Sequence, residues 1–283
     1  MTDAGRKLVV DRQGVTIIGD GFQFSTSAVP RDALEPDLDG LVAQATGAGE
    51  VESVITGLQS MTRLTYGQYC ALSRALEVIG ERWSMLLVRN LLVGPRKLAD
   101  LQQGLPRLPA DTLLARLREL EHGGVVRRTP DEVDGEVYEL TEFGLELDDI
   151  TVRLGQWGAR LLGEPRAEDI ITPDALVMAL RSNFRPEASF GREAGYQVQI
   201  AEFDLVVYAY VRDGVMSSGV GPLPGGADVV IETGMNIRPL LTGELDPDEA
   251  VRAGAIQVDG DPALLHTFVA DFRMPAASPQ PEN

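Results

Sequence analysis

The chain has few of the residues that most often carry reactive chemistry, with one cysteine and two histidines among 283 residues. The single cysteine, Cys70, excludes an intrachain disulfide and agrees with a reducing cytoplasm. His122 and His266 lie far apart in the sequence, so one cysteine and two histidines offer few ligands for a zinc site and few partners for a Cys-His catalytic pair. No Gly-rich loop precedes a helix in a phosphate-binding pattern. We therefore expect no metal, no cofactor and no enzymatic activity.

Long apolar runs are also missing. No stretch reaches the roughly 18 apolar residues that a transmembrane helix needs, and no basic segment followed by an apolar core opens the chain. The composition, 44% hydrophobic and 24% charged, is that of a soluble globular protein. The length fits two domains at about 150 residues per domain. We expect a cytoplasmic protein without a membrane partner.

Charge is distributed unevenly along the chain, whose formal net charge is -18. Residues 61–128 hold 11 basic and 6 acidic side chains, whereas residues 129–283 hold 10 basic and 28 acidic ones. Such an asymmetry is typical of a segment that faces nucleic acid and is joined to an acidic domain. Charge blocks also arise for other reasons, so the pattern needs support from a motif.

Residues 1–60 form an N-terminal extension whose pattern assigns no single fold. The stretch KLVVDRQGVTIIGDGFQFSTS alternates weakly, which suggests two short strands around a turn. The stretch PDLDGLVAQATGAGEVESVITGLQS favours one or two short helices.

Residues 61–163 carry the strongest pattern. Three helical segments, in CALSRALEVIG, RWSMLLVRNLL and RKLADLQQG, precede a fourth in which Leu113, Leu117 and Leu120 share one face. The strands VVRRT and VYELT follow, separated by a turn at Asp134-Gly135. A long amphipathic helix closes the segment. Two helices joined by a short turn and followed by a hairpin indicate a winged helix-turn-helix domain.

Several short motifs resemble the HxlR-type winged-helix transcriptional regulators. Over residues 66–163 they are a cysteine that opens the first helix, I-G-x-x-W, L-R-E-L-E, a short G-V-V strand, Y-x-L-T and a late W-G. Each motif alone is weak, and their order and spacing together are specific. The resemblance implies a DNA-binding transcriptional regulator that pairs as a homodimer through the first and last helices of the domain.

The second helix of a helix-turn-helix places its N-terminal residues on the base edges of the major groove. On the second helix this geometry predicts DNA contacts for Pro109, Ala110, Asp111, Thr112, Ala115 and Arg116. Arg96 and Lys97 open the preceding helix, near where a backbone phosphate would lie. On the wing, one of Arg127 and Arg128 is expected to face DNA. Arg118 is a weaker candidate because neighbouring glutamates can hold it. The alternative is that all these charges are a solvated surface. The acidic wing tip, around Asp131 to Glu136, argues against a wing that grips phosphate.

Cys70 stands where some HxlR-type regulators carry a redox-sensing cysteine, so the resemblance makes it a candidate redox site. Ala71 follows it, where the family often has proline, which weakens the match. Arg74 lies one turn further along and can lower the thiol pKa. The alternative is a small packing residue of the dimer helix.

Residues 164–275 indicate a second, α/β domain, and the tail at 276–283 has the composition of disorder. Asp246, Pro247 and Glu249 form the start signal of a helix, and DPALLHTFVADF is an amphipathic helix. Residues 227–272 resemble the sterol-carrier-protein-type lipid-binding domain, which implies a sheet covered by helices with an apolar tunnel between them. The pattern does not indicate which residues line such a tunnel.

The predicted fold class is therefore α+β, a winged helix-turn-helix domain followed by an α/β sterol-carrier-like domain. Two functions remain open. The first is a homodimeric regulator that binds double-stranded DNA and an apolar small-molecule effector. The alternative is a lipid or hydrophobic-metabolite binding module whose winged domain serves dimerisation.

Overall fold

The computed structural model describes residues 7–11, 14–19, 22–26, 65–130, 135–163, 165–166, 168–234 and 237–275. Two compact units divide the chain, Met1–Glu77 and Val78–Asn283. The winged segment (from residue 78 to 163) and the C-terminal segment (164–275) thus share the second unit. The disordered tail expected at 276–283 and most of the acidic wing tip, residues 131–134, lie outside the described residues.

The first unit contains a three-stranded antiparallel sheet, where the sequence pattern suggested two strands. Its strands are β1 (Lys7–Asp11), β2 (Gly14–Gly19) and β3 (Phe22–Thr26), paired in that order. Helix α3 (Ala71–Ile79) begins in this unit and crosses the division.

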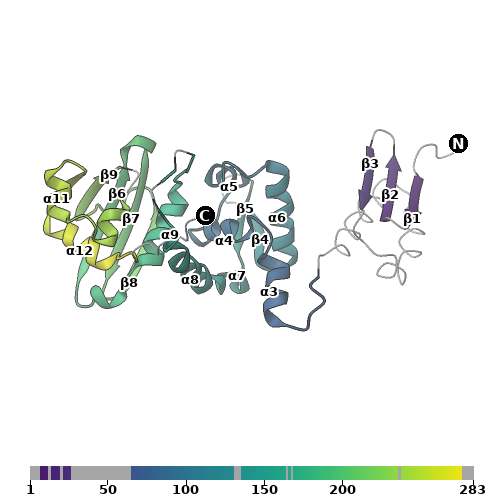
Figure 1. Cartoon of the computed structure of the whole chain (residues 1–283), viewed down its shortest axis with the longest axis horizontal. Coiled ribbons are helices and arrows are strands. Elements are labelled where there is room, and N and C mark those ends of the chain that lie inside the picture. Colours follow the sequence, from purple (N-terminus) through teal and green to yellow (C-terminus); the bar gives the residue numbers. More distant parts are fainter. Residues whose placement is uncertain are drawn as a thin grey trace. The chain divides into compact units, whose positions relative to one another are not determined.

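The winged helix-turn-helix segment has the predicted order of elements (Figure 1). Its helices are α4 (Ser84–Leu92), α5 (Leu98–Gly104), α6 (Ala110–His122), α7 (Glu142–Leu145) and α8 (Leu147–Ala159), and its hairpin is β4 (Val126–Pro130) with β5 (Glu136–Leu140). Leu113, Leu117 and Leu120 of α6 are buried in its core, as the spacing predicts. The two-turn helix α5 packs through Leu101, which is buried, while Leu98 of the same helix is 37% exposed.

A mixed five-stranded sheet forms the C-terminal segment. Its strands are β6 (Glu193–Ile200), β7 (Leu205–Arg212), β8 (Val215–Val220), β9 (Val229–Thr233) and β10 (Ile256–Gly260), in the spatial order β10-β9-β6-β7-β8. Only the β6–β9 pair is parallel among these strands of the described chain. Short 3-10 turns at Pro186–Ala188 and Ala201–Phe203 flank β6.

Three helices of the C-terminal segment are α10 (Arg238–Thr242), α11 (Pro247–Arg252) and α12 (Ala263–Asp271). Gly243 ends α10 with a φ of 77°, a left-handed conformation that favours glycine. The Asp246 carboxylate accepts the backbone N–H groups of Asp248 and Glu249, so it caps α11 as the sequence predicts. Phe268 and Phe272 pack their rings against Tyr196 of β6 in the core of this segment.

One helix of the C-terminal segment was not predicted. Helix α9 (Pro173–Asn183) lies between the sheet on one side and α4 and α8 on the other (Figure 1). Its sequence does carry a start signal, with Pro173 at the first helical position and Asp174 in the first turn. Leu176, Val177 and Leu180 are buried. This helix joins the winged segment and the sheet into one unit.

Candidate DNA-binding surface and ligand cavity

Helix α6 presents one continuous exposed stripe. At about 100° per residue, Asp111, Ala115, Arg118 and His122 lie opposite the buried leucines of the same helix. Asp111, Arg118 and His122 are exposed and Ala115 is half-buried. Pro109 and Ala110 are also exposed where the helix begins, while the Asp111 carboxylate accepts the Thr112 backbone N–H at 2.7 Å. The stripe thus has an accessible N-terminus and one central arginine.

Arg116 and Arg118 differ in their surroundings. The Arg116 guanidinium pairs with Glu119 and lies 3.5 Å from the Glu81 carboxylate, and only 20% of its side chain is exposed. It is thus turned from the exposed stripe toward the start of α4. Arg118 is exposed and lies in the centre of the stripe. The sequence favoured Arg116, which lies among the first residues of the helix, over Arg118, which neighbouring glutamates could hold. In the structure Glu119 pairs with Arg116 instead. The helical angle relative to the buried leucines was the signal that distinguishes the two arginines.

Both wing arginines are bound to glutamates. Arg127 donates to the Glu139 carboxylate across the hairpin at 2.8 Å, and Arg128 donates to Glu121 of α6 at 2.8 Å. At least half of each arginine side chain remains exposed. Because Arg127 and Arg128 are consecutive strand residues, they contact different partners on opposite faces of the hairpin, as the alternation predicts.

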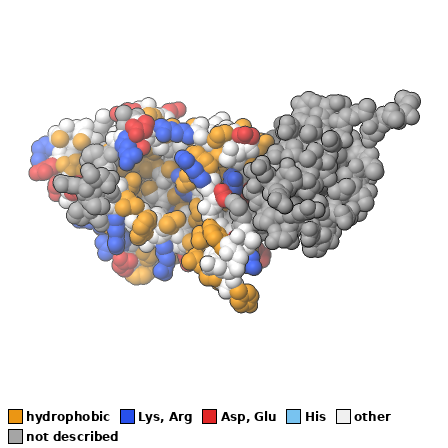
Figure 2. All heavy atoms as spheres, turned by 45° about the vertical axis from the view of Figure 1, so that its right-hand side comes forward, with side chains coloured by type: hydrophobic (Ala, Val, Ile, Leu, Met, Phe, Trp, Pro, Cys, Tyr) orange, Lys and Arg blue, Asp and Glu red, His pale blue; other side chains and the backbone are white. Residues whose placement is uncertain are grey.

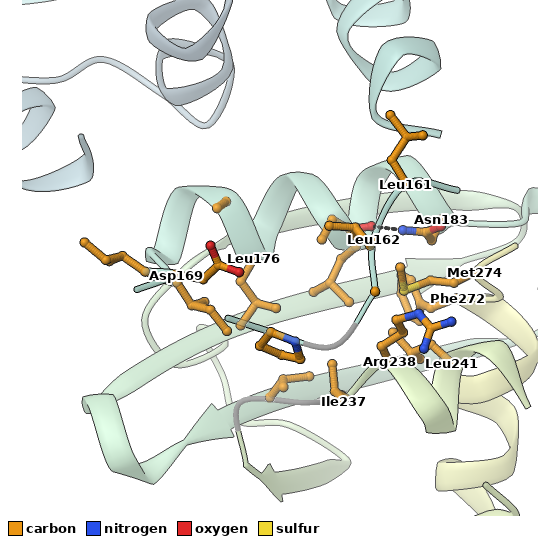
Figure 3. Close-up of a pocket in the computed structure, with 18 of the residues that line it drawn as sticks. Leu161, Leu162, Asp169, Leu176, Asn183, Ile237, Arg238, Leu241, Phe272 and Met274 are labelled. Carbon is orange, nitrogen blue, oxygen red and sulfur yellow. Dashed lines mark hydrogen bonds between the residues drawn. The ribbon is translucent and has the colours of Figure 1, made fainter. Parts of the chain in front are cut away.

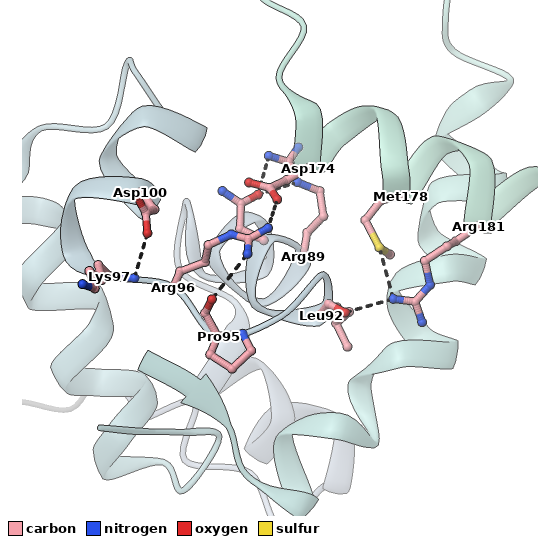
Figure 4. Close-up of polar contacts among 10 residues, drawn as sticks. Arg89, Leu92, Pro95, Arg96, Lys97, Asp100, Asp174, Met178 and Arg181 are labelled. Carbon is pink, nitrogen blue, oxygen red and sulfur yellow. Dashed lines mark hydrogen bonds and ion pairs between the residues drawn. The ribbon is translucent and has the colours of Figure 1, made fainter. Parts of the chain in front are cut away.

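Arg96 and Lys97 open α5. The Lys97 backbone N–H donates to the Asp100 carboxylate at 3.2 Å, which fixes the first turn of the helix. The Arg96 guanidinium donates instead to Asp174 of α9 at 2.6 Å (Figure 4). The backbone of Arg96 pairs with that of Tyr138 of the wing in both directions. Arg96 therefore connects α5, the wing and the C-terminal segment.

Cys70 lies immediately before α3 and is an exposed free thiol. The backbone N–H of Ser73 and then its hydroxyl group hydrogen-bond the sulfur and hold the thiol pKa below its usual value. A lowered pKa raises the fraction of reactive thiolate at neutral pH. The candidate redox role of Cys70 stays a prediction.

An apolar cavity of about 530 Å³ lies where α9, α10, the sheet and the segment after α8 meet (Figure 3). Leu176 and Leu180 of α9, Val198 of β6 and Leu241 of α10 form part of its wall. Leu161, Leu162 and Ile171 contribute from the segment that links the two halves of the unit. Asn183, Asp169, Arg166 and Arg238 are the polar lining residues. A volume of this size suits a drug-sized ligand, for which cavities of about 300–1,000 Å³ are typical.

Helix α8 leaves an apolar face uncovered. Ile150, Leu154 and Trp157 recur at helical spacing and are 52%, 50% and 61% exposed, and Leu161 continues the row. The sequence pattern suggested that this face is apolar, and the described chain does not bury it. Figure 2 shows exposed hydrophobic side chains gathered on one face of the molecule beside Lys and Arg side chains. Contiguous exposed apolar residues mark an interaction surface.

The described residues contain no group of three or more His, Cys, Asp or Glu residues arranged to hold a metal ion. They also contain no helix with the length and apolar character required to cross a bilayer.

Comparison with known proteins identifies the winged segment. A model of the HxlR-like helix-turn-helix family matches residues 78–165. The HTH-type transcriptional regulator YkvN of Bacillus subtilis (strain 168) is 34% identical over 115 residues, which cover 38% of this chain and 95% of YkvN. The chain belongs to the HxlR-like helix-turn-helix family.

Two further relatives match a similar length of this chain. The HTH-type transcriptional regulator Rv3095 of Mycobacterium tuberculosis (strain ATCC 25618 / H37Rv) is 39% identical over 102 residues, or 35% of this chain. The chain spans 64% of the length of Rv3095. The solved structure of the redox regulator HypR in its oxidized form is 33% identical and covers 31% of this chain and 94% of that one, with a TM-score of 0.30.

The thiol of Cys70 provides a pH-dependent prediction. Because its pKa is lowered, its alkylation rate by iodoacetamide should reach half-maximum at a lower pH than that of glutathione. Ser73→Ala removes the hydroxyl but keeps the backbone N–H, so it should move the midpoint part of the way back up. Rates measured from pH 6 to 10 test both shifts. The conservative control is Thr267→Ala, which removes an exposed helical hydroxyl in the C-terminal segment. A midpoint at the glutathione value would contradict the prediction.

Proposed function

We propose that this protein is a DNA-binding transcriptional regulator whose α6 enters the major groove. The observation that carries the proposal is the exposed stripe of α6, which lies opposite the core leucines of a helix-turn-helix. Membership of the HxlR-like family and the excess of basic residues over 61–128 support it.

Arg118 is the proposed base-reading residue of α6. Its exposed guanidinium lies in the middle of the stripe, and arginine pairs bidentately with guanine. Pro109, Ala110, Asp111, Thr112 and Ala115 line the same end of the helix and contact bases or adjoining phosphates. Arg116 positions α6 through its glutamate partners, and Arg127 or Arg128 contacts phosphate from the wing.

Fluorescence anisotropy with the duplex upstream of its own coding sequence tests this function. The wild-type protein should prefer this duplex over a scrambled one by about 10³-fold or more at physiological salt. Arg118→Ala should weaken specific binding by about 1–3 kcal/mol, because one bidentate base contact is lost. Arg252→Ala, which removes an exposed arginine of α11, is the matched control. Equal weak binding to both duplexes would favour the alternative, a hydrophobic-metabolite binding module.

The regulator is proposed to act as a homodimer through the apolar face of α8. Ile150, Leu154 and Trp157 expose a row of large side chains that a second copy of the chain covers. The family resemblance supports the same helix as a dimer element. Two copies present two α6 helices to half-sites about 34 Å apart, or one DNA turn.

Substitution of the α8 face tests the dimer. Trp157→Glu places a charge in the centre of the apolar row, so it should convert the dimer to a monomer and raise the dissociation constant at least 100-fold. Size-exclusion chromatography with light scattering measures the mass. Phe203→Glu, at an aromatic residue that is 47% exposed in the C-terminal segment, should leave the dimer intact. A wild-type chain that is monomeric at micromolar concentration would contradict the assignment.

The C-terminal segment is proposed to bind an apolar small molecule in the cavity beside α9. Apolar walls, a few polar groups and a volume of about 530 Å³ support this assignment. The resemblance of residues 227–272 to sterol-carrier-type domains points to the same class of ligand. Such a ligand changes DNA affinity if it binds two conformations of the protein unequally.

A neutral apolar fluorophore, Nile red, probes the cavity. The wild-type protein should bind it saturably with increased fluorescence. Ala179→Phe fills the cavity from the exposed side of α9 and should weaken binding about tenfold or more. Ala270→Phe, at an exposed alanine of α12 that does not line the cavity, is the control. Equal binding by both variants would place the fluorophore elsewhere.

A further inference from the structure

One buried carboxylate of α9 faces two guanidinium groups of the winged segment. Asp174 is 5% exposed and accepts the Arg96 guanidinium at 2.6 Å. Figure 4 shows Arg89 of α4 beside the same carboxylate, and Asp174 is the group whose charge opposes the lowering of the Arg89 pKa by burial. One carboxylate thus lies among two guanidinium groups.

The surrounding backbone is closely packed against Asp174. A Cβ added at Gly104, the last residue of α5, would lie 3.0 Å from an Asp174 carboxylate oxygen and 2.4 Å from the Asn90 side-chain nitrogen. Glycine at this position therefore lets α5 approach α9 closely. The carboxylate occupies a site formed by α4, α5 and α9.

Arg96 is the winged-segment residue placed at the start of α5, where the helix-turn-helix geometry brings a DNA phosphate. Its side chain is 21% exposed and its guanidinium is engaged by Asp174. A phosphate and a carboxylate use the same guanidinium donors, so the two anions compete for them.

We propose that Asp174 is an internal competitor of DNA phosphate for Arg96, so that the C-terminal segment restrains DNA binding by the winged segment. This inference rests on the proposed function, whose regulation it specifies. Opening of the Arg96–Asp174 ion pair frees one guanidinium per subunit for phosphate. The restraint lies within the fold because α9 is fixed to the winged segment at a second point, where Arg181 donates to the Leu92 carbonyl at 3.1 Å and pairs with Asp148.

The dependence of DNA affinity on salt counts phosphate contacts, since each contact adds about 0.9 to the slope of log K against log salt concentration. Asp174→Asn keeps the side-chain shape and removes the competing charge. The full-length variant should show a slope steeper by about 0.9 per subunit, which is about 3.5-fold more loss of affinity between 50 and 200 mM salt for one subunit and about 12-fold for the proposed dimer. Adding Arg96→Gln to Asp174→Asn should remove this gain.

Glu187→Gln is the charge-matched control, because it also removes one negative charge from the C-terminal segment, at an exposed pair with Arg185. It should leave the slope at the wild-type value. An equal increase in Glu187→Gln and Asp174→Asn would mean that net charge alone is responsible and would overturn the proposal.

A second variant keeps the test decisive if Asp174→Asn does not fold by circular dichroism and thermal unfolding. Arg96→Gln alone should lower the slope by less than half of 0.9 per subunit, because the guanidinium is engaged by Asp174. A full loss of 0.9 would mean that Arg96 already contacts phosphate, and would overturn the proposal. The same slopes are measured on a scrambled duplex. Equal affinity for the two duplexes would contradict the proposed function, whereas the slopes themselves still test whether Asp174 competes with phosphate for Arg96.

Discussion

A buried ion pair between Arg96 and Asp174 links the winged segment to the C-terminal segment of the second unit. It joins the residue that pairs with the wing strand to the first turn of α9, and the opposite side of α9 forms a wall of the apolar cavity. Removing one partner of a buried pair leaves the other charge without compensation, at a cost of about 3–5 kcal/mol. Under the proposed function this one short helix links the DNA surface to the cavity, and coupling between two ligands is reciprocal.

For the proposed DNA-binding function, so acidic a chain depends on how its charges are paired locally. The arginines of α6 and the wing, Arg116, Arg127 and Arg128, each contact a glutamate of the same domain. The pairs of Arg127 and Arg128, whose side chains are 58% and 50% exposed, are of a kind that contributes about 0–1 kcal/mol, so they orient the guanidinium groups without binding them tightly. The buried pair of Arg96 differs, because water does not screen it to the same extent.

Sequence patterns predicted the elements that rest on local periodicity and capping. The leucine spacing of α6, the hairpin after it and the Asp246 cap of α11 are local signals, and the structure has each of them. Helix α9 was missed although Pro173 and Asp174 mark its start, because no motif drew attention to residues 165–195. The Arg96–Asp174 pair joins residues 78 positions apart, and no local pattern encodes such a contact. Which of Arg116 and Arg118 lies on the exposed stripe of α6 depends on the side from which the core leucines pack, and this had to be read from the structure.

Leu161, Leu162 and Ile171 belong to the segment that connects the two halves of the unit, and they also line the cavity. The length of this connection therefore helps to set the shape of the cavity. Insertions or deletions in it would reshape the cavity without touching the sheet. The wall is built from both halves of the unit, so grafting the C-terminal half onto another winged domain would not carry the whole cavity with it.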